Sequence, residues 1–69
     1  MTAAQAAQKV RNAIRKTGTD PKGLVRVINT GYTTEVDVDM KWLDEDAEYK
    51  VFQVINEIDG AGGFAWNCY

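Results

Sequence analysis

The sequence predicts an α+β two-layer sandwich in which two helices cover one face of a three-stranded sheet. Residues 3–16 and 44–58 place apolar side chains at the spacing of amphipathic helices. Residues 32–41 instead alternate apolar and polar side chains, which is typical of a half-buried strand. Strand-like segments at 24–29 and 63–69 complete the order α-β-β-α-β, and the 69 residues suffice for one small domain.

The first helix is predicted over residues 3–16. Thr2 and Gln5 have the spacing of a capping box before it, and Gly18 supplies a stop signal after it. One face of this helix is apolar and rich in alanine, and the other is basic. We therefore expect the alanine face to approach the sheet closely and the basic face to meet solvent or a partner.

The predicted strands are separated by turn residues. The segment TGTDPKG precedes the first strand, and Thr30 with Gly31 predicts a hairpin turn between the first and second strands. In the second strand, Val36, Val38 and Met40 are expected to face the core. In the last strand, 63–69, the side chains of Phe64 and Trp66 are expected to turn toward the helices beside these valines.

The second helix is predicted over residues 44–58, with Asp44 as its N-cap and Gly60 at its end. This helix returns the chain across the sheet, so the third strand should run parallel to the second. We expect the strand order 2-1-3, in which every neighbouring pair is antiparallel. The alternative places the third strand beside the second and creates one parallel pair. In both cases the two helices share one sheet face and leave the other face open.

The composition argues against most enzyme chemistry. The chain has no histidine and no serine, which removes Ser-His catalysis and the usual nitrogen ligand of zinc. The single cysteine, Cys68, predicts neither a zinc site nor an internal disulfide. The glycine-rich run at 59–63 follows a helix rather than preceding one, unlike a phosphate-binding loop. We therefore expect a non-enzymatic protein without a metal or cofactor.

The formal charge of −2 conceals an uneven distribution along the chain. Residues 1–31 carry six cations and one acid, a net charge of +5, whereas residues 32–69 carry two cations and nine acids, a net charge of −7. Such asymmetry informs on partners rather than on the fold. No run of apolar residues approaches the length of a membrane helix, and the cysteine content gives no indication of an oxidising compartment, so we expect a cytoplasmic protein.

Acidic residues form the main candidate binding surface. Three of them alternate along the second strand at a spacing of about 6.6 Å, too wide to hold one cation together. In the simplest interpretation these carboxylates are only solvated by water. If they have a function, we expect them to bind a basic partner. The candidate protein-binding residues are Glu35, Asp37, Asp39, Asp44, Glu45, Asp46, Glu48 and Tyr49.

Aromatic residues near the second helix supply further contact candidates. Tyr49 points away from the apolar arc of this helix and is expected at the surface. Trp42 and Phe52 are instead expected to wrap the edge of the small core.

These features favour a binding module that acts through protein–protein contact. Size and charge suggest an inhibitor or adaptor, for example a phage-type antagonist of a nucleic-acid-handling host complex, which would meet a basic protein surface through the acidic sheet face. One alternative is weak nucleic-acid binding through the cations of the first helix, Lys9, Arg11, Arg15 and Lys16. Another is a structural homo-oligomer in which the basic and acidic halves of different copies meet.

Overall fold

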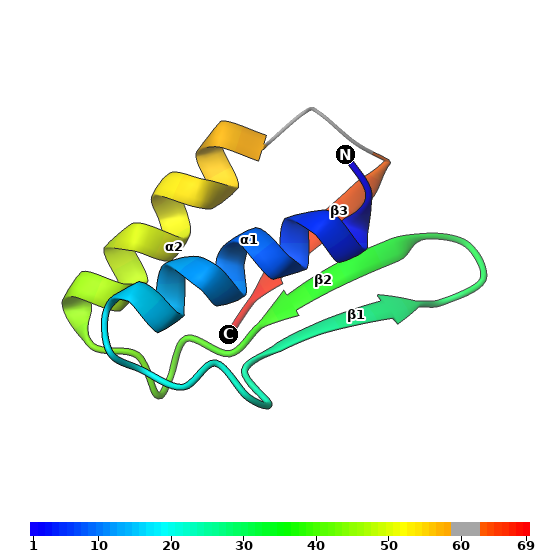
Figure 1. Ribbon diagram of the computed structural model, residues 1–69. Helices are drawn as coiled ribbons and strands as arrows, with labels where there is room; N and C mark the ends of the chain where they lie inside the picture. Colours follow the sequence, from blue (N-terminus) through cyan, green and yellow to red (C-terminus); the bar gives the residue numbers. More distant parts are fainter. Residues whose placement is uncertain (59–62) are drawn as a thin grey trace.

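The computed structural model describes residues 1–58 and 63–69, and it confirms the predicted α+β class and element order (Figure 1). The element bounds lie within a few residues of those predicted. The expected helix end at Gly60 and most of the glycine-rich run lie outside the described residues. The elements are α1 (Ala3–Lys16), β1 (Val25–Asn29), β2 (Thr34–Val38), α2 (Glu45–Ile58) and β3 (Phe64–Cys68).

The order of strands in the sheet is β1-β2-β3, so the predicted order 2-1-3 is wrong. β1 and β2 pair antiparallel, with Val27 opposite Val36. β3 runs parallel to β2, as expected from the helical crossover, but it also lies directly beside β2, with Trp66 opposite Val36. The sheet is therefore mixed, and β2 is its central strand. This position explains why Val36 and Val38 are fully buried.

α1 begins and ends at the residues that the capping and stop signals of the sequence predict. The Thr2 side chain accepts a hydrogen bond from the Gln5 backbone N–H at 3.1 Å, and the Gln5 side chain accepts one from the Thr2 N–H at 2.9 Å. Together these bonds form the predicted capping box. At the other end, Gly18 takes a φ of +89°, a conformation that costs a glycine little. The first helix is thus defined by local chemistry at both ends.

The β1–β2 hairpin closes through side-chain and backbone hydrogen bonds in the turn at 30–33. The Asn29 carboxamide oxygen accepts from the Gly31 N–H at 2.9 Å, and Gly31 has a φ of +89°. The Thr30 N–H donates to the Thr33 carbonyl at 2.9 Å. These contacts set the antiparallel register of β1 and β2.

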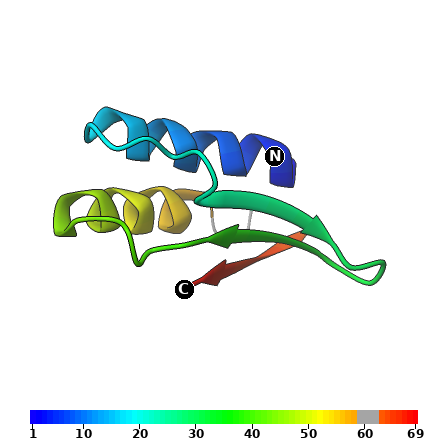
Figure 2. The same cartoon turned by 90° about the horizontal axis from the view of Figure 1, so that it is seen from below.

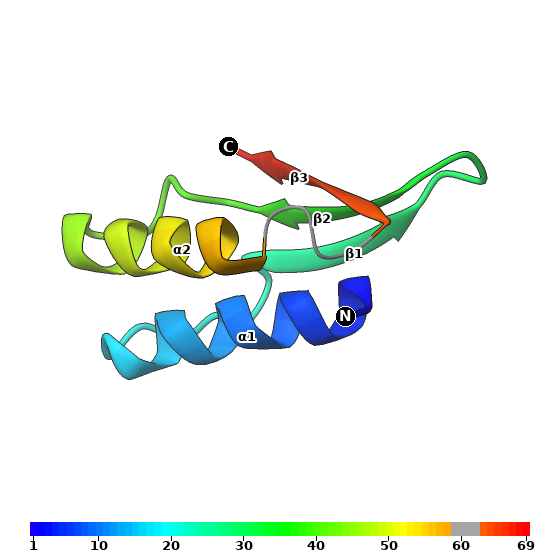
Figure 3. The same cartoon turned by 90° about the horizontal axis from the view of Figure 1, so that it is seen from above.

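One hydrophobic core lies between the helices and one face of the sheet. Val25, Val36 and Val38 form the sheet side of this core, and Phe64 and Trp66 pack against it, as predicted. The helices contribute side chains that are fully buried: Ala7, Val10 and Ile14 from α1, and Ala47 and Val51 from α2. Both helices therefore cover the same face of the sheet, with α1 beside α2 (Figures 1 and 3).

The sheet has two outer edges, formed by β1 and β3. The views from below and above show β3 at the margin of the molecule opposite α1 (Figures 2 and 3). Among the described residues, no strand pairs with the outer edge of either strand. These edges and the face opposite the helices are the surfaces that the fold leaves open.

Candidate functional site

The predicted acidic row on β2 is less exposed than the sequence suggests. Glu35 and Asp39 are half-buried, and Asp37 is only 6% exposed. Asp37 lies on the face opposite the helices, between Arg26 of β1 and Asn67 of β3. The Asn67 side-chain N–H donates to the Asp37 carboxylate at 3.1 Å. The middle acid of the row is thus held within the sheet rather than presented to a partner.

Basic side chains accompany the two C-terminal acids of this row. A shallow depression of about 270 Å³ on the open face is lined by Asp37 and Asp39 together with Arg26, Lys41, Tyr69 and Gly23. The two carboxylates and the two cations balance in formal charge. Asp39 also accepts a hydrogen bond from the Lys41 backbone N–H at 3.1 Å. The depression therefore does not present the net negative surface that the strand sequence alone predicts.

The remaining acidic candidates gather at the start of α2. Asp44 caps this helix, as predicted, because its carboxylate accepts a hydrogen bond from the Ala47 N–H at 2.8 Å. Glu45 and Asp46 are exposed and Glu48 is half-buried. All three lie in the first turn, where negative charge interacts favourably with the helix dipole. The first turn of α2 is the densest exposed group of acids among the described residues.

Aromatic side chains adjoin this acidic turn. Tyr49 is 62% exposed, which agrees with its predicted place at the surface. Trp42 is 74% exposed and Phe52 44%, so these two do not wrap the core edge as expected. The prediction for them was wrong because Leu43 and Val51 fill the core positions next to them.

Helical spacing places Tyr49 and Phe52 on one face of α2. This α2 outer face consists of residues at positions i, i+3, i+4, i+7 and i+11, and it lies opposite the buried positions Ala47, Val51 and Ile58. Its members are Glu45, Glu48, Tyr49, Phe52 and Asn56. An aromatic centre with acids at one end is therefore open to solvent.

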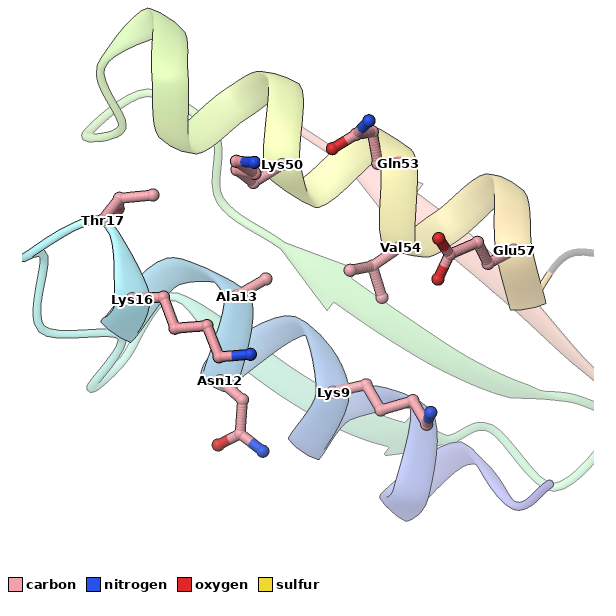
Figure 4. A pocket seen from close by; sticks show the side chains of 9 residues that line it. All are labelled: Lys9, Asn12, Ala13, Lys16, Thr17, Lys50, Gln53, Val54 and Glu57. Carbon is pink, nitrogen blue, oxygen red and sulfur yellow. The ribbon is translucent and has the colours of Figure 1, made fainter.

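The predicted basic face of α1 divides into two sides. Lys9 and Lys16 line an interhelix groove of about 600 Å³ between α1 and α2, together with Lys50 (Figure 4). Glu57 contributes one carboxylate to this groove, and Asn12 and Gln53 contribute amides. The sequence did not indicate Lys50, since helix pairing rather than chain position brings it to the cations of α1.

The two arginines of α1 do not belong to the interhelix groove. The Arg11 guanidinium donates a hydrogen bond to the Val25 carbonyl of β1 at 3.1 Å, and Arg11 is half-buried. The Arg15 guanidinium donates to the Asn12 side-chain oxygen at 3.0 Å on the exposed surface. The four cations proposed for nucleic acid therefore do not form one continuous patch.

Cys68 lies in the edge strand β3 with its side chain exposed, and partial desolvation of the thiol by its neighbours raises its pKa. A raised thiol pKa lowers the fraction of reactive thiolate at neutral pH. Within residues 1–58 and 63–69, no three His, Cys, Asp or Glu side chains gather as a metal-binding group. None of the helices described is long and apolar enough to cross a membrane.

No protein-family model, curated protein or solved structure matches this chain.

Proposed function

We propose that the protein is a small, non-enzymatic binding module, an inhibitor or adaptor that contacts another protein through the α2 outer face. The observation that supports this proposal is the exposure of Tyr49 and Phe52 on one helix face directly beside the acids of the first turn. Exposed aromatic side chains next to a charged rim are frequent interface anchors. The proposed partner presents an apolar pocket bordered by basic side chains.

The acidic sheet row has a smaller part in this proposal than the sequence suggested. Asp37 is held by Asn67, so the accessible acids are those that flank Tyr49, above all Glu45 and Asp46. A basic surface that normally holds nucleic acid is one chemical match for them, as in a phage-type antagonist of a nucleic-acid-handling complex. We expect the module to act in the cytoplasm, because a single cysteine forms no internal disulfide.

The test compares variants at two exposed tyrosines. Protein captured from native cell extract is identified, purified and titrated by calorimetry against wild type, Tyr49→Ala and Tyr32→Ala. Tyr32 is 98% exposed in the β1–β2 hairpin and provides the matched control. We expect Tyr49→Ala to raise Kd at least about tenfold, as removal of an interface anchor does, and Tyr32→Ala to leave it unchanged.

Charge reversal tests the acidic rim separately. Glu45→Lys with Asp46→Lys should slow association and reduce its dependence on salt, whereas Glu35→Lys with Asp39→Lys on the sheet face should have a smaller effect. Binding that tolerates Tyr49→Ala and the Glu45/Asp46 reversal alike is incompatible with a role for the α2 outer face.

A second candidate function is contact with nucleic-acid phosphates in the interhelix groove. The observation that favours it is that Lys9, Lys16 and Lys50 all line this groove (Figure 4). Electrophoretic shift of DNA and RNA at several salt concentrations tests this function. Three lysine–phosphate contacts predict a slope of roughly −2 to −3 in log K against log salt. Lys16→Glu with Lys50→Glu should abolish the shift, whereas Arg15→Glu outside the groove should not.

A further inference from the structure

The outer edge of β3 carries free backbone groups at alternate residues. The Tyr69 N–H donates to the Val38 carbonyl at 2.9 Å, and the Tyr69 carbonyl accepts from the Met40 N–H at 2.6 Å. Because successive residues of a strand direct these groups to opposite edges, Ala65 and Asn67 also face β2. The N–H and C=O groups of Phe64, Trp66 and Cys68 consequently point outward, where no described strand pairs with them.

The β1 edge is protected in a way that the β3 edge is not. On β1, the outward carbonyl of Val25 accepts a hydrogen bond from Arg11, and the strand carries the charge of Arg26. β3 has the sequence FAWNC, without charge or proline. Charged side chains and covered backbone groups are the usual means of keeping an edge strand from pairing with another chain. Among residues 1–58 and 63–69, these features are present at the β1 edge and not at the β3 edge.

The side chains along the β3 edge add apolar surface. Phe64 and Trp66 are half-buried and form an edge-to-face pair with ring centroids 5.5 Å apart. Cys68 beside them is exposed. All three are on the helix-facing side of β3, so the residues with free backbone groups also carry the partly uncovered side chains.

We propose that β3 is a homodimer interface, in which the β3 strands of two copies pair antiparallel with Trp66 at the two-fold axis. In this register, Trp66 lies opposite its equivalent and Phe64 lies opposite Cys68 of the second copy. Each outward N–H and C=O then finds a partner, so the two three-stranded sheets become one continuous sheet of six strands. A second copy suits this edge because β3 brings no charges into opposition.

The interface is independent of the proposed function, since it uses β3 rather than the α2 outer face. It also differs from an assembly in which the basic and acidic halves meet, because salt should weaken that assembly and leave strand pairing largely intact. Light scattering across protein concentration and salt measures the mass. We expect a mass of twice 7.7 kDa at high concentration in both low and high salt.

Amide hydrogen exchange identifies the surface that pairs. The amides of Phe64, Trp66 and Cys68 should gain protection as protein concentration rises, whereas those of Ala65 and Asn67 should be protected throughout by β2. The outward amide of Val27 on β1 serves as the internal control and should exchange rapidly at every concentration. A dimer without added protection at Phe64, Trp66 and Cys68 would overturn the proposal, as would a monomer at all concentrations.

Matched edge variants complete the test. Cys68→Pro removes one outward donor without touching the bonds to β2, and Val27→Pro removes the corresponding outward donor of β1. We expect Cys68→Pro to raise the dimer dissociation constant roughly tenfold or more, and Val27→Pro to leave it unchanged. Cys68→Lys and Val27→Lys repeat the comparison with charge, so that a proline variant that fails to fold does not decide the result. Equal dimerisation of the Cys68 and Val27 variants would contradict β3 pairing.

Discussion

Asp37 shows how sheet position changes the role of a single carboxylate. The alternation of β2 correctly places it on the face away from the helices, but it is buried there between neighbouring strands. Periodicity identifies the face of a strand and not the strands on either side of it. The burial of Asp37 depends on Arg26 and Asn67, and the latter is 30 residues away in the chain. The sequence therefore predicts the orientation of this residue and not its accessibility.

We expect Asp37→Ala to lower the free energy of unfolding by about 1–3 kcal/mol, because it leaves the Asn67 amide without its partner. Urea denaturation measures the change. Glu35→Ala, on the same face of the same strand, is the matched control and should stay within about 0.5 kcal/mol of wild type. If Asp37 and Asn67 contribute through their mutual hydrogen bond alone, Asn67→Ala added to Asp37→Ala should cost little more. Equal effects at Asp37 and Glu35 would contradict the assignment.

The thiol of Cys68 gives a pH-dependent prediction. Partial desolvation raises its pKa, so the thiolate forms at higher pH in the folded chain than in the unfolded one. Alkylation by iodoacetamide should therefore be slower in the folded protein at neutral pH, and its half-maximal rate should shift to higher pH than in urea. Because the unfolded state deprotonates first, stability should also decline as pH rises above about 8.5, an effect absent in Cys68→Ser. A half-maximal alkylation rate at the same pH in the folded protein as in urea, or at a lower pH, would contradict the raised pKa of the Cys68 thiol.

At the scale of elements, local sequence signals were sufficient to predict the two helices and the β1–β2 hairpin. The capping box of α1, the Asp44 cap of α2 and the glycine turn at 31 all act within a few residues of the chain. The place of β3 in the sheet is different, because both candidate positions satisfy the same alternation and the same crossover. What decides between them is a non-local pairing, in which Trp66 lies beside Val36 on the central strand. The sequence therefore predicted the helices and strands correctly, but it placed β3 beside β1 instead of beside β2.

The alanine face of α1 leads to a prediction about how closely this helix packs against the core. Ala7 is fully buried in the core, whereas Ala4 on the same helix is exposed. We expect Ala7→Leu to lower the free energy of unfolding by about 1–3 kcal/mol, because the added methylenes find no space between α1 and the rest of the core. Ala4→Leu adds the same atoms at the surface and should change stability by no more than about 0.5 kcal/mol. Comparable urea midpoints for the two variants would show that the helix does not pack closely.

At the scale of the whole molecule, the uneven charge of the two chain halves is partly balanced on the open face of the sheet. Arg26 from the basic half lies opposite Asp37 from the acidic half, and both line the same depression. On the open sheet face, the charge segregation along the chain therefore does not become charge segregation over the surface. The unbalanced regions that remain are the interhelix groove and the first turn of α2, which is why the proposed functions concern them.

The two sheet edges determine how large an assembly becomes. A sheet with one open edge stops at a dimer, whereas a sheet with two open edges continues to add copies. Arg11 covers the Val25 carbonyl and Arg26 places a charge on the same strand, so in the proposed dimer we expect the β1 edges to add no further copies. An arginine proposed from the sequence as a nucleic-acid contact thus has a structural explanation, since it joins α1 to the margin of the sheet.

Removal of this protection should extend the assembly beyond two copies. We expect Arg11→Ala with Arg26→Thr to yield species heavier than a dimer in light scattering, because the outward groups of β1 become available for pairing. Arg15→Ala with Lys22→Thr removes the same charge from exposed positions away from the β1 edge and should remain dimeric. Adding Cys68→Pro to the Arg11/Arg26 variant should limit growth again, because pairing through β3 is then weakened. An Arg11/Arg26 variant with the mass of wild type would show that another feature closes the β1 edge.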